Sequence, residues 1–399
     1  MGQSESKEVI ADGKFEQLQQ IATRQGPAAV LQYLKDNVNQ WKEEKVLFAV
    51  TGRSATGKSM FINKIRDVQP TDEKFAKSGS GNTTKEPTAY QNPQNKRIVF
   101  YDLPGVGTME FKKETYIADM QLRKYDYFFI FFDKVVSEDD YFLVCKLVEM
   151  KKPFCLVRSK IDDDLRNAED DGKRKEEVIP AIREQIKEQI SRYEHLKNSD
   201  AIFLISSKRK DTGDWENLLH HIEKCLPPPK FETFMYSLPT LTENVIDLKY
   251  QTLRKRIKLA TLAAACIAAA PVPGLDVVAN LALLVEEVVH YINVFGLSKE
   301  RLEALDGLDR KILNCASFHI QDLPGMDLAK VIIAQLGKYV AIFTIESVAD
   351  IFLPIIGSIV SAGTSAVFTY RYLSRTLDNF RDDARIVYRF VMDKQDIKL

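Results

Sequence analysis

The sequence predicts an α/β domain with a doubly wound, mostly parallel sheet, joined to an all-α helical domain built from the N- and C-terminal segments. Two observations predict the sheet. Between residues 45 and 226 short apolar runs alternate with charged amphipathic stretches, and a glycine-rich loop follows the first run. Beyond residue 240 the apolar spacing is helical throughout. We therefore expect domains at residues 1–44, 45–226 and 227–399.

Several short apolar runs are expected to be buried strands, at residues 45–51, 97–102, 126–132, 154–159 and 201–206. The amphipathic stretches between them are expected to be helices, at 111–124, 138–151 and 175–197. The alternation ends at Pro227-Pro228-Pro229. Because prolines cannot continue a helix and form a stiff linker, we place a domain boundary there. Residues 13–44 should form helices interrupted at Gly26-Pro27.

The glycine-rich loop from Gly52 to Ser59 has the pattern G-x-x-x-x-G-K-S, after the first predicted strand and at the start of a predicted helix. Its glycines let the backbone wrap around a phosphate, and the helix N-terminus adds positive potential. Lys58 would then contact the β- and γ-phosphates, and the Ser59 hydroxyl would bind Mg²⁺. The alternative is an ordinary glycine turn, which the flanking strand and helix disfavour.

Asp102-Leu103-Pro104-Gly105 closes the second predicted strand, at the edge where a doubly wound sheet binds its ligands. Asp102 can hold Mg²⁺ through water, and the Gly105 N–H can contact the γ-phosphate and release it after hydrolysis. The next residue, Val106, stands where many small GTPases have a glutamine that orients the attacking water. We therefore expect slow hydrolysis unless another group, such as one from a second copy, takes that role.

Ser159-Lys160-Ile161-Asp162 follows the fourth predicted strand and is a variant of the N/T-K-x-D element. The Asp162 carboxylate can accept hydrogen bonds from the N1–H and 2-amino group of guanine, a donor pair that adenine lacks. The Lys160 stem would cover the base. The alternative is an exposed charged loop. Ser206-Ser207-Lys208 follows the last strand, where backbone N–H groups can meet the guanine O6.

Thr83-Thr84 lies in a polar loop ahead of the second strand. We expect one of the two hydroxyls, and favour Thr84, to complete the Mg²⁺ shell only when a γ-phosphate is bound. Residues 75–90 would then be a switch segment.

The predicted site combines these elements. The roles in hydrolysis fall to Lys58, Ser59, Thr84 and Gly105, and the Mg²⁺ site to Ser59, Thr84 and, through water, Asp102. The residues expected to contact the nucleotide are Gly52, Arg53, Ser54, Ala55, Thr56, Gly57, Lys58, Ser59, Met60, Asp102, Ser159, Lys160, Asp162, Ser206, Ser207 and Lys208.

The N-terminus reads Met1-Gly2-Gln3-Ser4-Glu5-Ser6 and matches the acceptor pattern for N-myristoylation on Gly2. The alternative is an unmodified terminus. One myristoyl chain gives only marginal, reversible membrane attachment, so a second membrane contact would be needed.

Two strongly apolar blocks lie in the C-terminal helical region. Residues 259–295 are interrupted by Pro271-Val272-Pro273-Gly274, and residues 351–370 carry no charged side chain and have the length of a transmembrane helix. The small and hydroxyl residues of the second block also suit close helix packing. We favour a buried bundle, with a membrane-inserting hairpin as the alternative.

The composition excludes some classes of protein. Lysine plus arginine (56) equals aspartate plus glutamate (56), so no net charge favours nucleic acid. The five cysteines are scattered and never form C-x-x-C, which fits a reducing cytosol. Residues 1–26 lack the apolar centre of a secretory signal.

The motifs GRSATGKS, YDLPGVGT, VRSKIDDD and SSK, with MGQSES at the N-terminus, resemble those of the immunity-related GTPases, the interferon-inducible family of cell-autonomous defence. The resemblance implies a P-loop GTPase domain between helical segments, with GTP or GDP and Mg²⁺ bound. It also implies a dynamin-like mechanism: GTP-dependent homo-oligomers through GTPase-domain contacts, hydrolysis promoted in the assembly, and action at vacuolar or endomembranes. The P-V-P-G-L-D element at 271–276 and the 351–370 block resemble other GTPases with membrane-associated helical tails, which suggests a divergent member.

Three functions are compared. The first is a self-assembling GTPase that is cytoplasmic and peripherally associated with intracellular membranes, favoured by Lys58 and Ser59. The second is a nucleotide-gated regulator of membrane trafficking with slow turnover, which Val106 leaves open. The third is a structural helical membrane protein with a vestigial nucleotide domain, disfavoured because each phosphate and base element is present.

Overall fold

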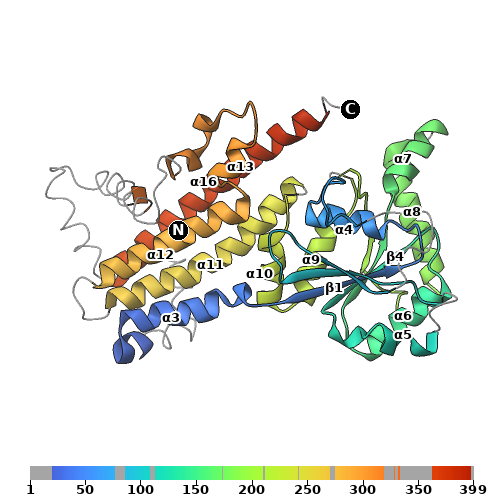
Figure 1. Cartoon of the computed structure of the whole chain (residues 1–399), viewed down its shortest axis with the longest axis horizontal. Helices are drawn as coiled ribbons and strands as arrows, with labels where there is room; N and C mark the ends of the chain where they lie inside the picture. The colour runs from blue at the N-terminus through green and yellow to red at the C-terminus, as the bar shows by residue number, and fades with distance from the viewer. Residues whose placement is uncertain are drawn as a thin grey trace. The chain divides into compact units, whose positions relative to one another are not determined.

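The structure, a computed structural model, describes residues 20–76, 86–107, 113–172, 174–209, 212–240, 242–269, 275–318, 328, 331–332 and 362–396. The chain divides into two compact units. The sheet unit is Trp41–Thr242, and the helical unit combines Met1–Gln40 with Glu243–Leu399. The N-terminal helix α3 (Pro27–Val38) lies beside helices from the C-terminal half of the chain (Figure 1). The predicted all-α part built from both ends of the chain is therefore confirmed.

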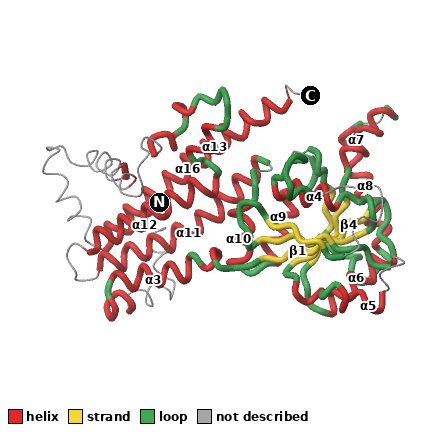
Figure 2. Tube along the Cα trace, viewed as in Figure 1, coloured by secondary structure: helices red, strands yellow, loops and turns green. Residues whose placement is uncertain are grey.

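The sheet unit contains a six-stranded sheet with the order β2-β3-β1-β4-β5-β6, shown in yellow in Figure 2. Neighbouring strands are parallel except β2 and β3, which are antiparallel. The predicted mostly parallel sheet is confirmed, and each predicted strand overlaps an observed one. The strands are β1 (Val46–Gly52), β2 (Thr88–Gln91), β3 (Ile98–Asp102), β4 (Tyr127–Phe132), β5 (Phe154–Arg158) and β6 (Ile202–Leu204).

Strand β2 is absent from the sequence prediction, which placed most of it in the polar switch segment 75–90. Its sequence is TAYQ, and none of its side chains is fully buried. It therefore lacks the apolar run by which the other strands were recognised, and it pairs along the backbone with β3 from Thr88↔Asp102 to Gln91↔Val99. An edge strand of this kind is held by main-chain hydrogen bonds rather than by burial.

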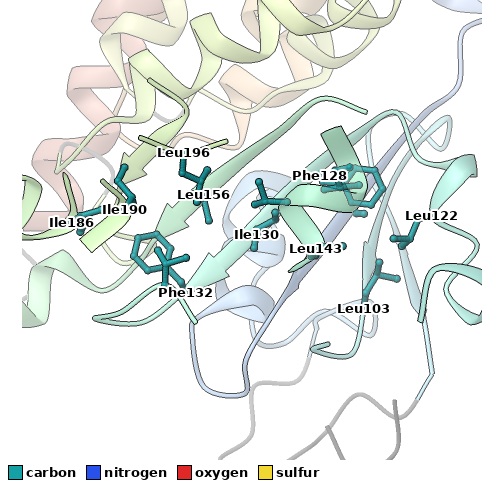
Figure 3. Packing of buried hydrophobic residues seen from close by; sticks show 14 of the residues in the cluster. Leu103, Leu122, Phe128, Ile130, Phe132, Leu143, Leu156, Ile186, Ile190 and Leu196 are labelled. Carbon is teal, nitrogen blue, oxygen red and sulfur yellow. The ribbon is translucent and has the colours of Figure 1, made fainter. Parts of the chain in front are cut away.

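Helices cover both faces of the sheet, as the residues of β4 show. All six are buried, and successive side chains point to opposite faces. On one face, the β4 side chains pack against α6 and α8 in the core cluster of Figure 3. On the other, Phe129 and Phe131 contact Phe61 of α4, with ring centroids 5.0 and 5.1 Å apart. The helices are α4 (Lys58–Arg66), α5 (Lys113–Asp119), α6 (Glu138–Glu149), α7 (Ile161–Asp170), α8 (Lys175–Ile190), α9 (Trp215–Cys225) and α10 (Pro228–Ser237).

The three prolines expected to form a stiff linker instead start helix α10, with Pro228 and Pro229 in its first turn. Proline is tolerated there because the first N–H groups of a helix have no intrahelical acceptor. The helix packs within the sheet unit. The ring centroids of Phe234 and Phe48 of β1 are 5.0 Å apart, and Thr233 Oγ1 donates to the Trp41 carbonyl at 2.6 Å.

The helical unit is built mainly from long helices. Its α11 and α16 run antiparallel, because polar pairs join residues that ascend along α11 to residues that descend along α16. These pairs are Glu243–Arg389 (2.7 Å), Asp247–Arg385 (2.6 Å) and Tyr250–Asp378 (2.7 Å). Besides α3, the helices are α11 (Glu243–Ala269), α12 (Leu275–Phe295), α13 (Lys299–Glu303) and α16 (Ala362–Asp396), with 3₁₀ turns at Arg310–Ile312 and Asn314–Phe318.

The two apolar blocks are only partly within the described residues, since 271–274 and 351–361 lie outside them. In the described part of the chain, one helical segment, Asn280–Glu303, is long and apolar enough to cross a membrane by length and composition. The core helix of a soluble bundle meets the same criteria, and 56% of the most apolar 18-residue stretch of this segment is buried. That the two apolar blocks form a buried bundle, and not a membrane-inserting hairpin, therefore stays a prediction.

Candidate functional site

The phosphate-binding loop predicted at Gly52–Ser59 joins the end of β1 to the start of α4. Two of its glycines are required because other atoms lie too close for a side chain. A Cβ on Gly52 (φ +132°) would lie 1.9 Å from the carbonyl oxygen of Phe131 in β4. A Cβ on Gly57 (φ +94°) would lie 2.4 Å from Ser159 Oγ. The second contact brings the loop against the Ser159 segment, as a shared nucleotide site requires.

The Lys58 ammonium lies inside the loop. Its Nζ donates to the carbonyl oxygens of Gly52 (2.8 Å) and Arg53 (2.9 Å), and the residue is only 9% exposed. Burial lowers the Lys58 pKa, and the Asp102 carboxylate opposes this shift. Charges interact more strongly where solvent is excluded. Lys58 thus lies where the predicted phosphate-binding loop needs a cation.

The outer part of the loop is open to solvent. Arg53, Ser54 and Ala55 are exposed, and Met60 on the first turn of α4 is 39% exposed. Thr56 is buried instead, and its Oγ1 donates to the Arg53 carbonyl at 2.8 Å, which closes the loop on itself. The loop therefore has a braced inner side and an accessible outer side.

The predicted magnesium ligands meet at the start of α4. Ser59 Oγ lies 3.5 Å from the Asp102 carboxylate, at the end of β3. A hydroxyl and a carboxylate are the oxygen donors that Mg²⁺ prefers, so these residues fit the ion. Thr83 and Thr84 lie outside the described residues, and the ligand expected from them stays a prediction.

The segment after Asp102 is fixed by a tyrosine that the sequence prediction missed. Tyr116 of α5 is fully buried, and its hydroxyl donates to the Pro104 carbonyl at 2.6 Å and contacts Thr51 Oγ1 at 3.0 Å. A Cβ on Gly105 would come within 3.0 Å of the Gly52 carbonyl oxygen, so this segment lies directly on the phosphate-binding loop. In the sequence, Tyr116 looks like any core residue of an amphipathic helix.

Val106 packs its half-buried side chain against the core cluster. An apolar side chain cannot hydrogen-bond water. The prediction that this position lacks a water-orienting group is consistent with its packing.

The predicted base-reading residues come together from two strand ends. Ser159 Oγ donates to the Thr56 carbonyl at 2.5 Å, which ties this segment to the phosphate-binding loop. Ser206 Oγ donates to the Asp162 carboxylate at 2.7 Å and accepts the N–H groups of Lys208 and Arg209. Serine at position 159 therefore makes the loop-to-loop bond expected of the usual asparagine or threonine.

The two lysines of the predicted base site are placed differently. Lys160 adopts a left-handed conformation (φ +66°) at the position before α7, which begins at the next residue. The Lys208 ammonium lies 3.4 Å from Asp162 and 3.2 Å from Asp163, and these carboxylates raise its pKa. Ser207 is also buried. The Asp162 carboxylate is thus contacted by Ser206 and Lys208, which follow β6.

Helix α4 also fixes the residues on both sides of 77–85, which sequence reasoning did not anticipate. The Asn63 side chain exchanges two 2.8 Å hydrogen bonds with the backbone of Ala76. The buried Arg66 guanidinium donates to the carbonyls of Lys74 (3.1 Å) and Gln91 (3.0 Å). A charged residue near a helix end gave no signal for this role.

A phosphate-binding loop, an adjacent carboxylate and a second carboxylate held between two loops at the carboxyl ends of parallel strands define a P-loop guanine-nucleotide-binding protein. The sequence model of the interferon-inducible GTPase (IIGP) family matches residues 15–350. The chain belongs to this family, and it is a GTPase. The roles of the individual site residues stay predictions.

Two relatives agree with this assignment. The chain is 29% identical over 360 residues to interferon-gamma-inducible GTPase 10 of Mus musculus, an alignment that covers 87% of this chain and 82% of that protein. It is 34% identical over 261 residues to interferon-inducible GTPase 1 of Mus musculus, covering 64% of this chain and 62% of that protein. A solved structure of Aquifex aeolicus Era bound to GDP.AlF4- aligns with a TM-score of 0.32 and 18% identity, over 56% of this chain and 67% of that one.

Proposed function

We propose that the chain binds GTP with Mg²⁺ and hydrolyses it in assemblies of several copies, which act at intracellular or vacuolar membranes in cell-autonomous immunity. The observation that carries the nucleotide chemistry is the buried Lys58 ammonium inside the loop, next to Ser59 and Asp102. Ser59 and Asp102, with Thr84, would hold Mg²⁺, which would supply charge neutralisation at the phosphates. Lys58 and the loop N–H groups would orient the same phosphates.

Self-assembly is proposed because Val106 stands where many small GTPases have a glutamine that orients the attacking water. Val106 is apolar and packs on the core cluster, so it cannot orient water. A group from a second copy, placed against the nucleotide site, would provide the missing stabilisation. Such groups supplied by a partner accelerate hydrolysis by orders of magnitude in other GTPases.

The membrane and the immune role are supported by sequence and family. The Gly2 pattern provides one weak lipid anchor, and an apolar face of the helical unit would provide the second contact. The relatives named above are interferon-inducible, which supports a role in defence. The alternative is a slow-turnover, nucleotide-gated regulator in membrane trafficking, which the apolar Val106 favours.

The two functions differ in how turnover depends on concentration. GTP hydrolysis per molecule is measured over a wide range of protein concentration, with and without liposomes, using the myristoylated full chain. We expect the specific rate to rise with concentration, and to rise at lower concentration on liposomes, because a surface raises the effective concentration.

Two variants calibrate this measurement. Lys58→Ala should abolish turnover at every concentration, whereas Lys45→Ala, an exposed lysine at the opposite end of β1, should behave as the wild type. A specific rate that is flat in both conditions would reject self-activation and leave the regulator as the better account.

A further inference from the structure

Arg158 is a buried cation next to the predicted base site that the function described so far does not use. It is the last residue of β5, an interior strand, and pairs in register with Phe132 of β4 and Leu204 of β6. It is 6% exposed. A charged side chain is rarely buried without a partner.

The partner is Asp164 in the first turn of α7. Arg158 Nη2 lies 2.8 Å from Asp164 Oδ2, and only 7% and 22% of the two side chains are exposed. This ion pair connects the end of the strand to the start of the helix. It therefore spans the Ser159-Lys160-Ile161-Asp162 segment, which holds the predicted base-reading carboxylate.

The first turn of α7 carries three consecutive carboxylates, Asp162, Asp163 and Asp164, and the first two share a contact with Lys208. Asp162 accepts from Ser206 Oγ (2.7 Å), Asp163 contacts Lys208 (3.2 Å) and Arg166 (3.0 Å), and Asp164 contacts Arg158. The Asp164 contact is the one that reaches from the helix to the interior of the sheet. Because residues of one helical turn are rigidly linked, fixing Asp164 also fixes the rotation of the turn that carries Asp162.

We propose that Arg158 is a positioning residue for guanine recognition: through Asp164 it holds the first turn of α7 so that the Asp162 carboxylate faces both the N1–H and the 2-amino group of guanine. This inference rests on the proposed function, in which Asp162 reads the base. A buried ion pair adds little stability compared with an apolar pair of the same volume. An arginine on an interior strand is therefore better explained by the geometry it imposes than by the stability it adds.

The test compares GDP with IDP, which lacks the 2-amino group, by equilibrium binding to the full chain. In the wild type, IDP loses a hydrogen bond to a charged group. The ratio of the IDP dissociation constant to the GDP dissociation constant should therefore be about ten to a hundred. Arg158→Met should reduce this ratio to about threefold or less, because a misaligned carboxylate loses the second contact. Arg158→Lys should restore part of the ratio, since it keeps the cation.

The matched control is Arg166→Met, which removes the same charge from a pair with the adjacent carboxylate. Arg166 is 66% exposed, and its partner Asp163 is not the base-reading residue. This variant should keep the wild-type ratio. Asp164→Asn, at a half-buried position, should lower the ratio as Arg158→Met does, and it decides the matter if Arg158→Met fails to fold.

Different results contradict different statements. A wild-type ratio near one would overturn base reading by Asp162, and the positioning role with it. A large wild-type ratio that Arg158→Met and Asp164→Asn both preserve would overturn the positioning role alone, even if these variants bind GDP more weakly or melt earlier. A purely structural role weakens both nucleotides equally and leaves the ratio unchanged.

Discussion

Ala55 has a backbone conformation that is energetically unfavourable for residues other than glycine. Its φ is +62°, in the left-handed region, within the exposed part of the phosphate-binding loop. This conformation costs an L-residue about 1–2 kcal/mol, whereas the added freedom of glycine in the unfolded chain costs about 0.4–1 kcal/mol. We expect Ala55→Gly to stabilise the sheet unit by about 0.5–1 kcal/mol in urea denaturation. Tryptophan fluorescence is a suitable probe because Trp41 and Trp215 both belong to this unit.

The control is an alanine within a helix, where replacement by glycine should lower the stability of the unit. Ala181 is exposed in the middle of α8, so Ala181→Gly should destabilise the same unit by about 1 kcal/mol. A loss of stability for Ala55→Gly similar to that of Ala181→Gly would show that the strain at position 55 is negligible.

In the proposed function, Asp162 determines the choice of base. In Asp162→Asn an amide N–H would face the guanine donors, so we expect GTP affinity to fall by about a hundredfold or more and xanthosine triphosphate to become the better ligand. Displacement titrations with GTP, XTP and ATP measure this change. Asp163→Asn, next in sequence, should keep the preference for GTP. Comparable affinities of the wild type for ATP and GTP would contradict the assignment.

Residues with a fixed motif spacing could be predicted from the sequence, and the residues that hold them in place could not. Lys58, Asp102 and Asp162 could be assigned to the predicted site because their chemistry requires those residue types after a strand. Tyr116 and Arg158 support the same loops, yet a buried tyrosine or a strand-end arginine occurs in many sequences without such a role. Only the three-dimensional contacts distinguish them.

At the scale of elements, a buried ion pair links the helices of the helical unit. Arg256 of α11 contacts Glu287 of α12 at 2.7 Å, with 5% and 2% of the side chains exposed, and Arg256 Nη2 also donates to Asn39 Oδ1 at 2.8 Å. Removing one partner leaves an uncompensated buried charge, which costs about 3–5 kcal/mol. We therefore expect Glu287→Gln to lower the stability of this unit by about 3 kcal/mol.

Hydrogen exchange of α11 and α12 amides measures this effect, since both tryptophans lie in the other unit. Arg310→Met removes an exposed pair with Glu303 (51% and 46% exposed) and should change protection by less than about 0.5 kcal/mol. Arg256→Met/Glu287→Leu should recover much of the loss, because no unpaired charge remains. Protection unchanged in Glu287→Gln would contradict a stabilising role for the pair.

The errors in the element prediction have definite physical causes. Burial on both faces makes strands such as β4 visible as continuous apolar runs, and five strands were found in this way. The edge strand β2 has no such run, and the proline segment at 227–229 was assigned to a linker although proline also suits the first turn of a helix. Both errors concern positions where backbone geometry, rather than apolar burial, decides the structure.

At the scale of the whole molecule, the two ends of the chain belong to one unit. Asn39, near the end of the N-terminal segment, donates to Glu286 Oε1 at 2.9 Å and accepts from Arg256. A lipid attached at Gly2 would therefore be linked through the N-terminal segment to the helical unit. The predicted nucleotide site lies in the sheet unit.

Membrane attachment should depend on both the lipid and the nucleotide. A single myristoyl chain binds membranes marginally, but an assembly carries many chains and gains avidity. We expect the myristoylated full chain to sediment with liposomes much more with a non-hydrolysable GTP analogue than with GDP, and Gly2→Ala to stay in the supernatant with both. Gln3→Ala leaves the acceptor pattern intact and should sediment as the wild type. Equal sedimentation of Gly2→Ala and wild type would place the main membrane contact in the helical unit, and equal sedimentation with both nucleotides would separate attachment from assembly.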